Sequence, residues 1–197
     1  PACGQETVVK KENDVECLFC VNPECPAKKI KSFGLFTSRD AMNIDGLSEA
    51  TLEKFLAEGF LHTYADLFHL DRHRDAIMQM DGFGEKSYQN LEASVEKARH
   101  TNLARLIYSL GIPNIGIANA RMICREYKND LDKMLAAPTE ELAAMDGVGP
   151  VIAGAFVDFF AQEKNKTALE LLLKEVELEQ ETFSEEALPL SGQSFVI

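Results

Sequence analysis

The chain has 197 residues, of which 46% are apolar and 26% charged, and its formal net charge is −12 at pH 7. This composition excludes a disordered or collagen-like chain and is sufficient for a globular core. The sequence has no secretory leader pattern and no apolar run of the roughly 18 residues that a membrane-spanning helix needs. We therefore expect a cytoplasmic monomer without a membrane partner.

The N-terminal residues 1–30 have no helical period but hold four of the five cysteines: Cys3, Cys17, Cys20 and Cys25. Such a segment predicts a small module that is held together by something other than an apolar core. Four thiolates suit a closed, tetrahedral zinc site without a catalytic role, whereas disulfides are typical of oxidising compartments. We favour zinc over disulfides here. The fifth cysteine, Cys124, lies in an apolar helical stretch and is expected to be a core residue.

The apolar residues recur with helical spacing over residues 31–174, where strand signals nearly vanish. The predicted fold class is therefore mainly α, with a small cysteine module followed by a helical domain. Residues 175–189 are rich in glutamate and predict an acidic linker. Residues 190–197 have the pattern of a first strand of another domain. Because the chain starts without methionine and stops inside that strand, we expect a segment of a longer protein.

Four short turn sequences repeat within the helical domain at nearly equal intervals, centred on Gly46, Gly82, Asn114 and Gly147. Each copy reads apolar, Asp or Pro, Gly or Asn, apolar, Gly or Ser, and each lies between two helix-like stretches. Glycine most readily adopts the positive φ that such a tight turn needs, and asparagine is the next most tolerant residue. The apolar residue after each centre is expected to insert between the two helices: Leu47, Phe83, Ile115 and Val148.

The second small residue of each turn begins the following helix: Ser48, Gly84, Gly116 and Gly149. The first N–H groups of a helix are unpaired, and a small residue lets an anion approach them closely. One such turn alone would be interpreted as a helix connector, since glycine commonly ends helices. Four copies in register favour an array of phosphate sites. The scheme resembles the helix-hairpin-helix motif of DNA-binding proteins, which contacts the backbone without reading sequence.

The candidate DNA-binding residues are the small turn residues and basic residues just beyond turns two and three. They are Gly46, Ser48, Gly82, Gly84, Lys86, Asn114, Gly116, Arg121, Gly147 and Gly149, with Arg125 as a further source of positive charge. The net charge opposes a nucleic-acid partner at first sight, but main-chain amides bind phosphate without side-chain charge. We therefore expect modest, salt-dependent affinity. A scaffold for protein partners, in which the turns bind no phosphate, is the alternative.

Taken together, the motifs resemble the C-terminal region of bacterial NAD-dependent DNA ligases, from Pro1 to about Leu173. The resemblance is carried by Cys3-Gly4, the Cys20–Ala27 run, the four turns, and the runs at 42–47, 64–68 and 106–112. Residues 190–197 resemble the first strand of the BRCT domain that follows in that family. Other helix-hairpin-helix proteins of DNA repair, such as a Holliday-junction or excision-nuclease subunit, are not expected to have the cysteine module in front.

The resemblance implies structural zinc on Cys3, Cys20, Cys25 and a family cysteine that would precede Pro1. Cys17 is extra to that pattern, and the spacing leaves open whether it replaces the fourth ligand or the metal is lost. The family's enzymes seal nicks with NAD and magnesium, through a lysine in a Lys-x-Asp-Gly motif. That motif is absent from the sequence, so we expect no catalysis by this segment alone. Its implied role is to grip nicked double-stranded DNA beside the catalytic half of the same polypeptide.

Overall fold

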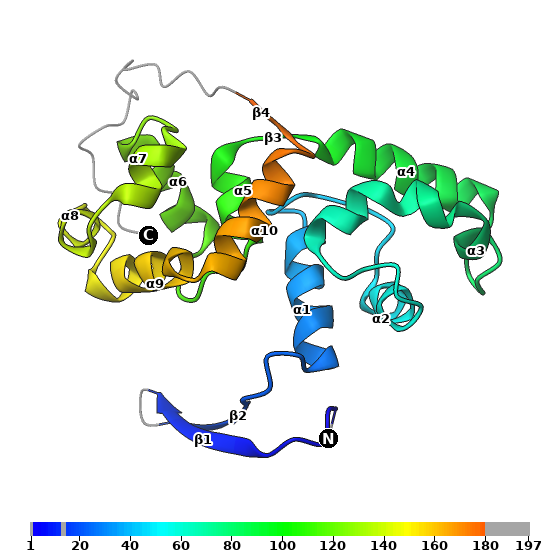
Figure 1. Ribbon diagram of the computed structural model, residues 1–197, viewed down its shortest axis with the longest axis horizontal. Coiled ribbons are helices and arrows are strands. Elements are labelled where there is room, and N and C mark those ends of the chain that lie inside the picture. The colour runs from blue at the N-terminus through cyan, green and yellow to red at the C-terminus, as the bar shows by residue number, and fades with distance from the viewer. Residues whose placement is uncertain (1, 13–14, 180–197) are drawn as a thin grey trace, which may run out of the picture.

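The computed structural model describes residues 2–12 and 15–179, and most of these residues are helical (Figure 1). Two strands come first, β1 (Thr7–Glu12) and β2 (Val15–Cys20). The helices of the first half are α1 (Pro26–Thr37), α2 (Glu49–Ala57), the 3₁₀ helix η1 (Tyr64–His73), α3 (Arg74–Met78) and α4 (Glu85–Ala98). The second half contains β3 (His100–Thr101), α5 (Leu103–Ser109), α6 (Ile117–Glu126), α7 (Leu131–Ala136), α8 (Thr139–Ala143), α9 (Pro150–Ala161), α10 (Glu163–Leu173) and β4 (Glu177–Leu178). The mainly helical fold predicted from the sequence is confirmed.

The N-terminal module is a two-stranded antiparallel ribbon in which β1 pairs with β2 from Thr7↔Cys20 to Glu12↔Val15. Figure 1 shows the ribbon below α1, away from the other helices. The cross-strand neighbours Val9 and Leu18 are 61% and 73% exposed, so their side chains add little to a core. An isolated ribbon of two strands is marginal in water. Its stability therefore depends on the cysteines at its base and on α1.

One continuous apolar core holds the helical part together, and it includes residues from nearly every helix. Its fully buried side chains include Phe36, Phe55, Leu106, Ile123 and Phe156. Proline occupies the first helical position of α1 and α9, where its missing N–H costs nothing and its fixed φ favours the helix. Among the helices of residues 2–12 and 15–179, none is long and apolar enough to span a membrane.

The C-terminal end of the described chain returns to the middle of the domain. After α10, β4 pairs in parallel with β3, with Glu177 N–H donating to the Arg99 carbonyl at 2.6 Å and Glu179 N–H to that of Thr101 at 2.8 Å (Figure 1). Val176 is buried. Residues 175–179, which the sequence predicts as the start of the linker, are therefore joined to the domain by the buried Val176 and by main-chain bonds to β3, although residues 177–179 are exposed. The rest of that linker and the strand expected at 190–197 lie outside the described residues.

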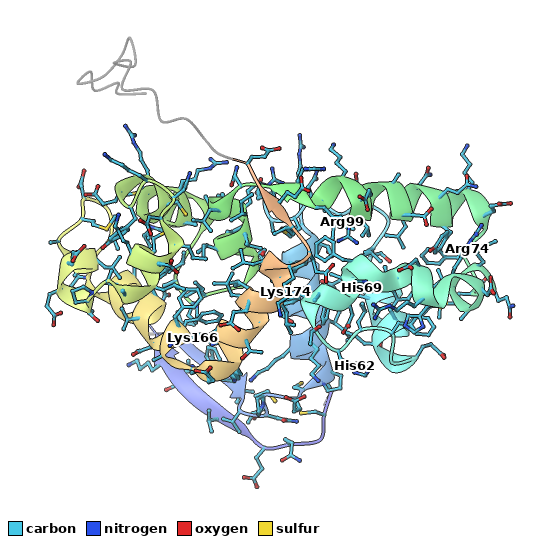
Figure 2. All side chains as sticks on the ribbon, turned by 45° about the horizontal axis from the view of Figure 1, so that its top comes forward. His62, His69, Arg74, Arg99, Lys166 and Lys174 are labelled. Carbon is cyan, nitrogen blue, oxygen red and sulfur yellow. The ribbon has the colours of Figure 1, made fainter. Side chains whose placement is uncertain are left out.

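A partly buried ion network fixes this return, and it joins three segments that are far apart in sequence. The Arg99 guanidinium donates to Glu175 Oε2 at 3.0 Å and to the Phe68 carbonyl at 2.8 Å, while His69 Nε2 lies 2.8 Å from Glu175 Oε1 (Figure 2). Burial alone would raise the pKa of Glu175, but the hydrogen bonds from His69 and Arg99 lower it below its ordinary value. The carboxylate thus stays charged and ties α10 to η1 and to the end of α4.

Glu175→Gln should lower the free energy of unfolding at pH 7 by about 1–3 kcal/mol, because the charge-assisted bonds weaken. The pKa of Glu175 is lower in the folded protein than its ordinary 4.5. Its contribution is therefore complete above pH 4.5 and is lost as the pH falls through the folded-state pKa. Urea unfolding at pH 7 and at acidic pH measures both effects. The control is Glu177→Gln, whose carboxylate is 81% exposed; equal losses in the two variants would contradict the prediction.

Candidate functional site

Four tight turns connect helices in this domain, and each has a positive φ at its centre. The φ values are 90° at Gly46, 88° at Gly82, 62° at Asn114 and 75° at Gly147. In three of the turns, the N–H of the next residue donates to the carbonyl three residues earlier: Phe83 to Met80, Ile115 to Ile112 and Val148 to Met145. A positive φ at the third residue with this hydrogen bond is the pattern of a type II turn. The choice of glycine or asparagine follows from that geometry.

The apolar residue after each centre anchors its turn to the core. Ile115 and Val148 are buried, at 5% and 0% exposure, and Leu47 and Phe83 are partly buried against the core. The small residues on both sides of each anchor are exposed. In each turn, the apolar anchor side chain therefore points into the core, while the backbone of the small residues beside it lies at the surface.

Turns two and four lead into helices that begin without a side-chain cap. Gly84 precedes α4 and Gly149 precedes α9, and neither helix receives a capping hydrogen bond from a side chain. A Cβ atom added at either glycine would have no atom within 4 Å among the described residues. The first amides of α4 and α9 are thus open to solvent, apart from the one that Pro150 lacks. Such helix starts attract anions through free N–H groups and the helix dipole.

Turns one and three use some of these amides internally. Ser48 caps α2 by accepting from the Thr51 N–H at 3.2 Å, and the Asp45 N–H donates to Ser94 Oγ of α4 at 2.7 Å. In turn three the Gly116 N–H donates to Asn119 Oδ1 at 3.3 Å. The four turns are therefore not equivalent as anion sites, and turns two and four have the freest amides.

The turns lie in two adjacent pairs, and in each pair a side chain from the second helix of one unit donates a hydrogen bond to the next turn. In the first pair, Lys54 of α2 donates to the Asp81 carbonyl of turn two at 3.1 Å. In the second pair, Asn119 of α6 donates to the Gly147 carbonyl of turn four at 3.4 Å, and the Met122 side chain lies against Gly147. Lys54 and Met122 occupy the same position relative to the start of their helices. In each pair, the second helix of one unit supports the turn of the next.

The predicted basic residues Lys86, Arg121 and Arg125 are all exposed, on the first turn of α4 and along α6. The acidic residues of the turns, Asp45 and Asp146 among them, are exposed as well. Side-chain charge therefore does not single these turns out as a basic surface. Any attraction for an anion has to come chiefly from the main chain.

Three of the four N-terminal cysteines meet at the base of the ribbon. The sulfur atoms of Cys3, Cys20 and Cys25 all lie within 4.8 Å of one another, and Cys3 Sγ is 3.5 Å from Cys20 Sγ. Four thiolates around zinc are about 3.8 Å apart when the Zn–S distance is about 2.3 Å, so the three positions fit three corners of such a site. The Gln5 N–H, followed by the Cys20 thiol, lowers the pKa of Cys3 to about 7. Although the Asn22 N–H would lower it, the same contact with Cys3 raises the pKa of Cys20, so without a metal these two thiols share the tendency to ionise unequally.

The other two cysteines lie elsewhere. Cys17 is exposed on β2, opposite Lys10, and it stands outside the group of three thiols. Successive side chains of a strand point to opposite faces, so Cys17 and Cys20, which are three residues apart on β2, point to opposite faces of the ribbon. Cys124 is 2% exposed on α6, as expected for a core residue.

Comparison with known protein families identifies the motif class of the second half of the chain. Residues 105–169, which contain turns three and four, match the family described as "Helix-hairpin-helix motif". The whole chain is similar to proteins named DNA ligase. It is 51% identical over 197 residues to that of Lachnoclostridium phytofermentans and 47% identical over 197 residues to that of Ruminiclostridium cellulolyticum, with all of the chain covered each time.

The chain is also 36% identical over 201 aligned residues to the DNA ligase of Brevibacillus brevis. It spans 30% of the length of each of these three relatives. The resemblance to a region of DNA ligases that the motifs indicate is thereby confirmed.

Sequence reasoning missed the residues that hold the turns in place, chiefly Lys54, Asn119 and Ser94. Their bonds join segments 27, 28 and 49 residues apart. One signal was present: Asn119 follows Gly116 by the spacing at which a polar side chain returns to the start of its helix. Nothing local marks Lys54 or Ser94.

Gly147→Ala should destabilise the protein more than Gly82→Ala. Both substitutions place Cβ at a positive φ, which costs about 1–2 kcal/mol, but only at Gly147 does the new atom collide with Met122. We expect an additional loss of less than about 1 kcal/mol in Gly147→Ala, because the atom that must move is the terminal methyl group of a flexible methionine. Urea unfolding of both variants, alone and with Met122→Ala, forms a double-mutant cycle. An additional loss that persists without the Met122 side chain would refute the collision as its cause.

Proposed function

We propose that the chain is the DNA-binding region of a DNA ligase, which grips nicked duplex DNA through its phosphate backbone without sequence preference. The observation that supports this proposal most strongly is that α4 and α9 begin at exposed glycines without a side-chain cap, Gly84 and Gly149. Phosphate oxygens can approach the free N–H groups there without meeting a side chain. The match to the helix-hairpin-helix family and the similarity to DNA ligases support this role.

All four turns are proposed to be helix-hairpin-helix units that act as two pairs on one duplex. The hydrogen bonds from Lys54 to turn two and from Asn119 to turn four support this pairing. In this arrangement Gly46, Ser48, Asn114 and Gly116 line the weaker phosphate sites, because part of their amides is already bonded. Lys86 and Arg121 add positive charge beside turns two and three. Backbone contacts position a protein without specifying sequence, which suits an enzyme that must act at any nick.

The charge of the chain bears on the strength of this binding. A net charge of −12 and the exposed turn aspartates repel DNA at long range, so attraction has to come from close contacts with the amides and from the few basic residues beside the turns, such as Lys86 and Arg121. Affinity should therefore be modest and should decrease as salt increases.

The parent protein is proposed to be an NAD-dependent ligase that uses magnesium, with catalysis in the part of the polypeptide that this chain does not cover. The absence of Lys-x-Asp-Gly from the 197 residues supports this division of roles. The segment itself would act as a monomeric clamp beside that catalytic half. Free thiols at all five cysteines fit the reducing cytoplasm.

Zinc is proposed as a structural ion on Cys3, Cys20 and Cys25, with a fourth ligand completing the tetrahedron. The support is the convergence of three thiols from separate segments onto one point. Asn22 shapes the short connection between two of them: its carbonyl accepts from the Cys25 N–H at 3.4 Å and its Oδ1 from the Glu24 N–H at 2.9 Å. A bound ion there would join the ribbon to α1.

Replacing both Gly84 and Gly149 with valine tests the phosphate contacts. Both positions have extended backbone and open space, so the fold should persist while the added methyl groups block close approach. We expect the affinity for nicked duplex to fall by at least about tenfold, since each lost bond to a charged group is worth about 1.5–3 kcal/mol. Fluorescence anisotropy at several salt concentrations provides the measurement.

Gly154→Val, inside α9, is the matched control, because its Cβ also has open space. Circular dichroism and thermal unfolding of each variant confirm folding. Unchanged DNA binding by the folded double variant would reject phosphate contact at these turns and favour the protein scaffold.

Metal analysis of purified variants tests the zinc site. Cys20→Ser and Cys25→Ser should lose zinc, because each removes one of the three convergent thiols. Cys17→Ser should retain the zinc content of the unmodified chain, because Cys17 lies outside that group. Zinc retained by Cys25→Ser but lost by Cys17→Ser would show that the ligand set is different.

A further inference from the structure

The exposed apolar side chains of the chain are concentrated on the β1–β2 ribbon. Among the described residues, seven large apolar side chains are exposed, and five of them lie within residues 8–21: Val8, Val9, Val15, Leu18 and Val21. Single apolar residues are normal on a protein surface, whereas a group of them marks an interaction site. In Figure 1 the ribbon stands apart from the helices other than α1, so the helical part of the structure leaves these side chains uncovered.

The register of the ribbon places its most exposed apolar side chains next to each other. Val9 and Leu18 lie directly opposite each other, so they share one face. Val15 is three residues from Leu18 and therefore lies on the other face. We name the Val9–Leu18 pair the ribbon patch. Lys11 and Glu16 are opposite each other on the same face beside it, and an apolar centre with a charged rim is typical of a protein interface.

The charge of the ribbon argues against DNA as the molecule that covers this patch. Residues 5–20 contain four acidic residues and two lysines, so their formal charge is −2. A phosphate backbone is attracted by a basic surface and repelled by an acidic one. An apolar protein surface is favoured instead, because contact with it removes Val9 and Leu18 from water.

The size of the ribbon indicates how that protein surface is attached. Each strand has six residues. With a rise of about 3.4 Å per residue and strands about 4.8 Å apart, one face measures roughly 20 Å by 10 Å, or about 200 Å². A stable complex of separate proteins buries about 800 Å² on each partner. The ribbon face is far smaller, which favours a partner in the same polypeptide, where the effective concentration reaches the millimolar range.

We propose that the ribbon patch docks on an apolar surface of the ligase polypeptide outside these 197 residues, in the part that carries catalysis. The chain spans 30% of the length of the three DNA ligases compared above, so a protein of that length has ample surface to cover the ribbon. This inference rests on the proposed function, in which the DNA-binding region works beside a catalytic part. It adds a contact that would orient the two parts relative to each other.

The test compares variants of the full-length parent ligase with the same variants of the 197-residue chain. Val9→Thr combined with Leu18→Thr makes the ribbon patch polar with a residue that favours strands. Val15→Thr is the matched control, because Val15 is 59% exposed and lies on the opposite face of the same ribbon. Hydrogen exchange of the ribbon amides, measured without DNA, reports how readily the ribbon opens. Zinc content is measured on every sample, so that a change at the cysteines is recognised.

In the full-length ligase, the double variant should exchange its ribbon amides about tenfold faster than the unmodified protein, the equivalent of about 1.4 kcal/mol. Val15→Thr should change the rate by no more than about twofold, as exposed substitutions usually do. In the 197-residue chain the double variant should have a much smaller effect, because the catalytic part is missing there. An equal effect of the double variant in both proteins would overturn the proposal, since it would arise from pairing within the ribbon.

A photo-crosslinking amino acid placed at Leu18 of the full-length ligase identifies the partner directly. Mass spectrometry should find cross-links within one molecule, from position 18 to peptides of the catalytic part, and few from the same group placed at Val15. Cross-links that join two copies of the protein, or that stay within the 197 residues, would reject the proposal. Cross-links to added nicked duplex would assign the patch to DNA instead.

Nick sealing by the unmodified full-length protein tests the proposed function separately. A protein that seals no nicks would refute the proposed function, whereas the cross-link from Leu18 to the rest of the polypeptide would still establish the docking contact. A protein that seals nicks without this cross-link would refute the docking contact alone.

Discussion

The need for a left-handed backbone at four corners governs the arrangement of this domain. At Gly46, Gly82, Asn114 and Gly147 the chain reverses within a few residues, and that is possible only where a positive φ is tolerated. The reversal lets the next apolar side chain enter the core, which fixes the following helix. The start of that helix is then left at the surface. A steric property of single residues thus determines both the packing and the groups offered to a ligand.

The two pairs of turns are joined by contacts that do not belong to any one turn. The Arg105 guanidinium reaches from α5 to the carbonyls of the segment before turn one, and the Arg99–Glu175 pair ties the end of α10 to the end of α4. β3 and β4 add a short ladder at the same place. The relative position of the pairs is therefore set by a few charged groups and main-chain bonds as well as by the shared core. That position would matter for the proposed binding of a rigid duplex, whose phosphates are regularly spaced.

The sequence predicts the features that depend on neighbouring residues. Turn chemistry indicates the corners, since glycine or asparagine directly after aspartate or proline is typical of a tight turn, and the place of the apolar residue after each corner indicates the buried anchor Val148. Prediction fails where distant residues decide the outcome. Glu175 has the composition of an acidic linker, and only its bond to Arg99, 76 residues earlier, makes it part of the domain. The ribbon at residues 7–20 was missed because its exposed valines give no clear pattern of one buried face.

Cys25 belongs to two structural units at once. Its sulfur is one of the three converging thiols. It is also the residue that directly precedes α1, and its carbonyl accepts from the N–H groups of Lys28 and Lys29 in the first turn of that helix. The direction in which the first helix leaves the ribbon is consequently tied to the geometry around that sulfur. A metal ion bound there would link the β1–β2 ribbon, which has almost no core of its own, to α1, the helix that leads to turn one. Oxidation of these thiols would then release the ribbon without unfolding the helices beyond it.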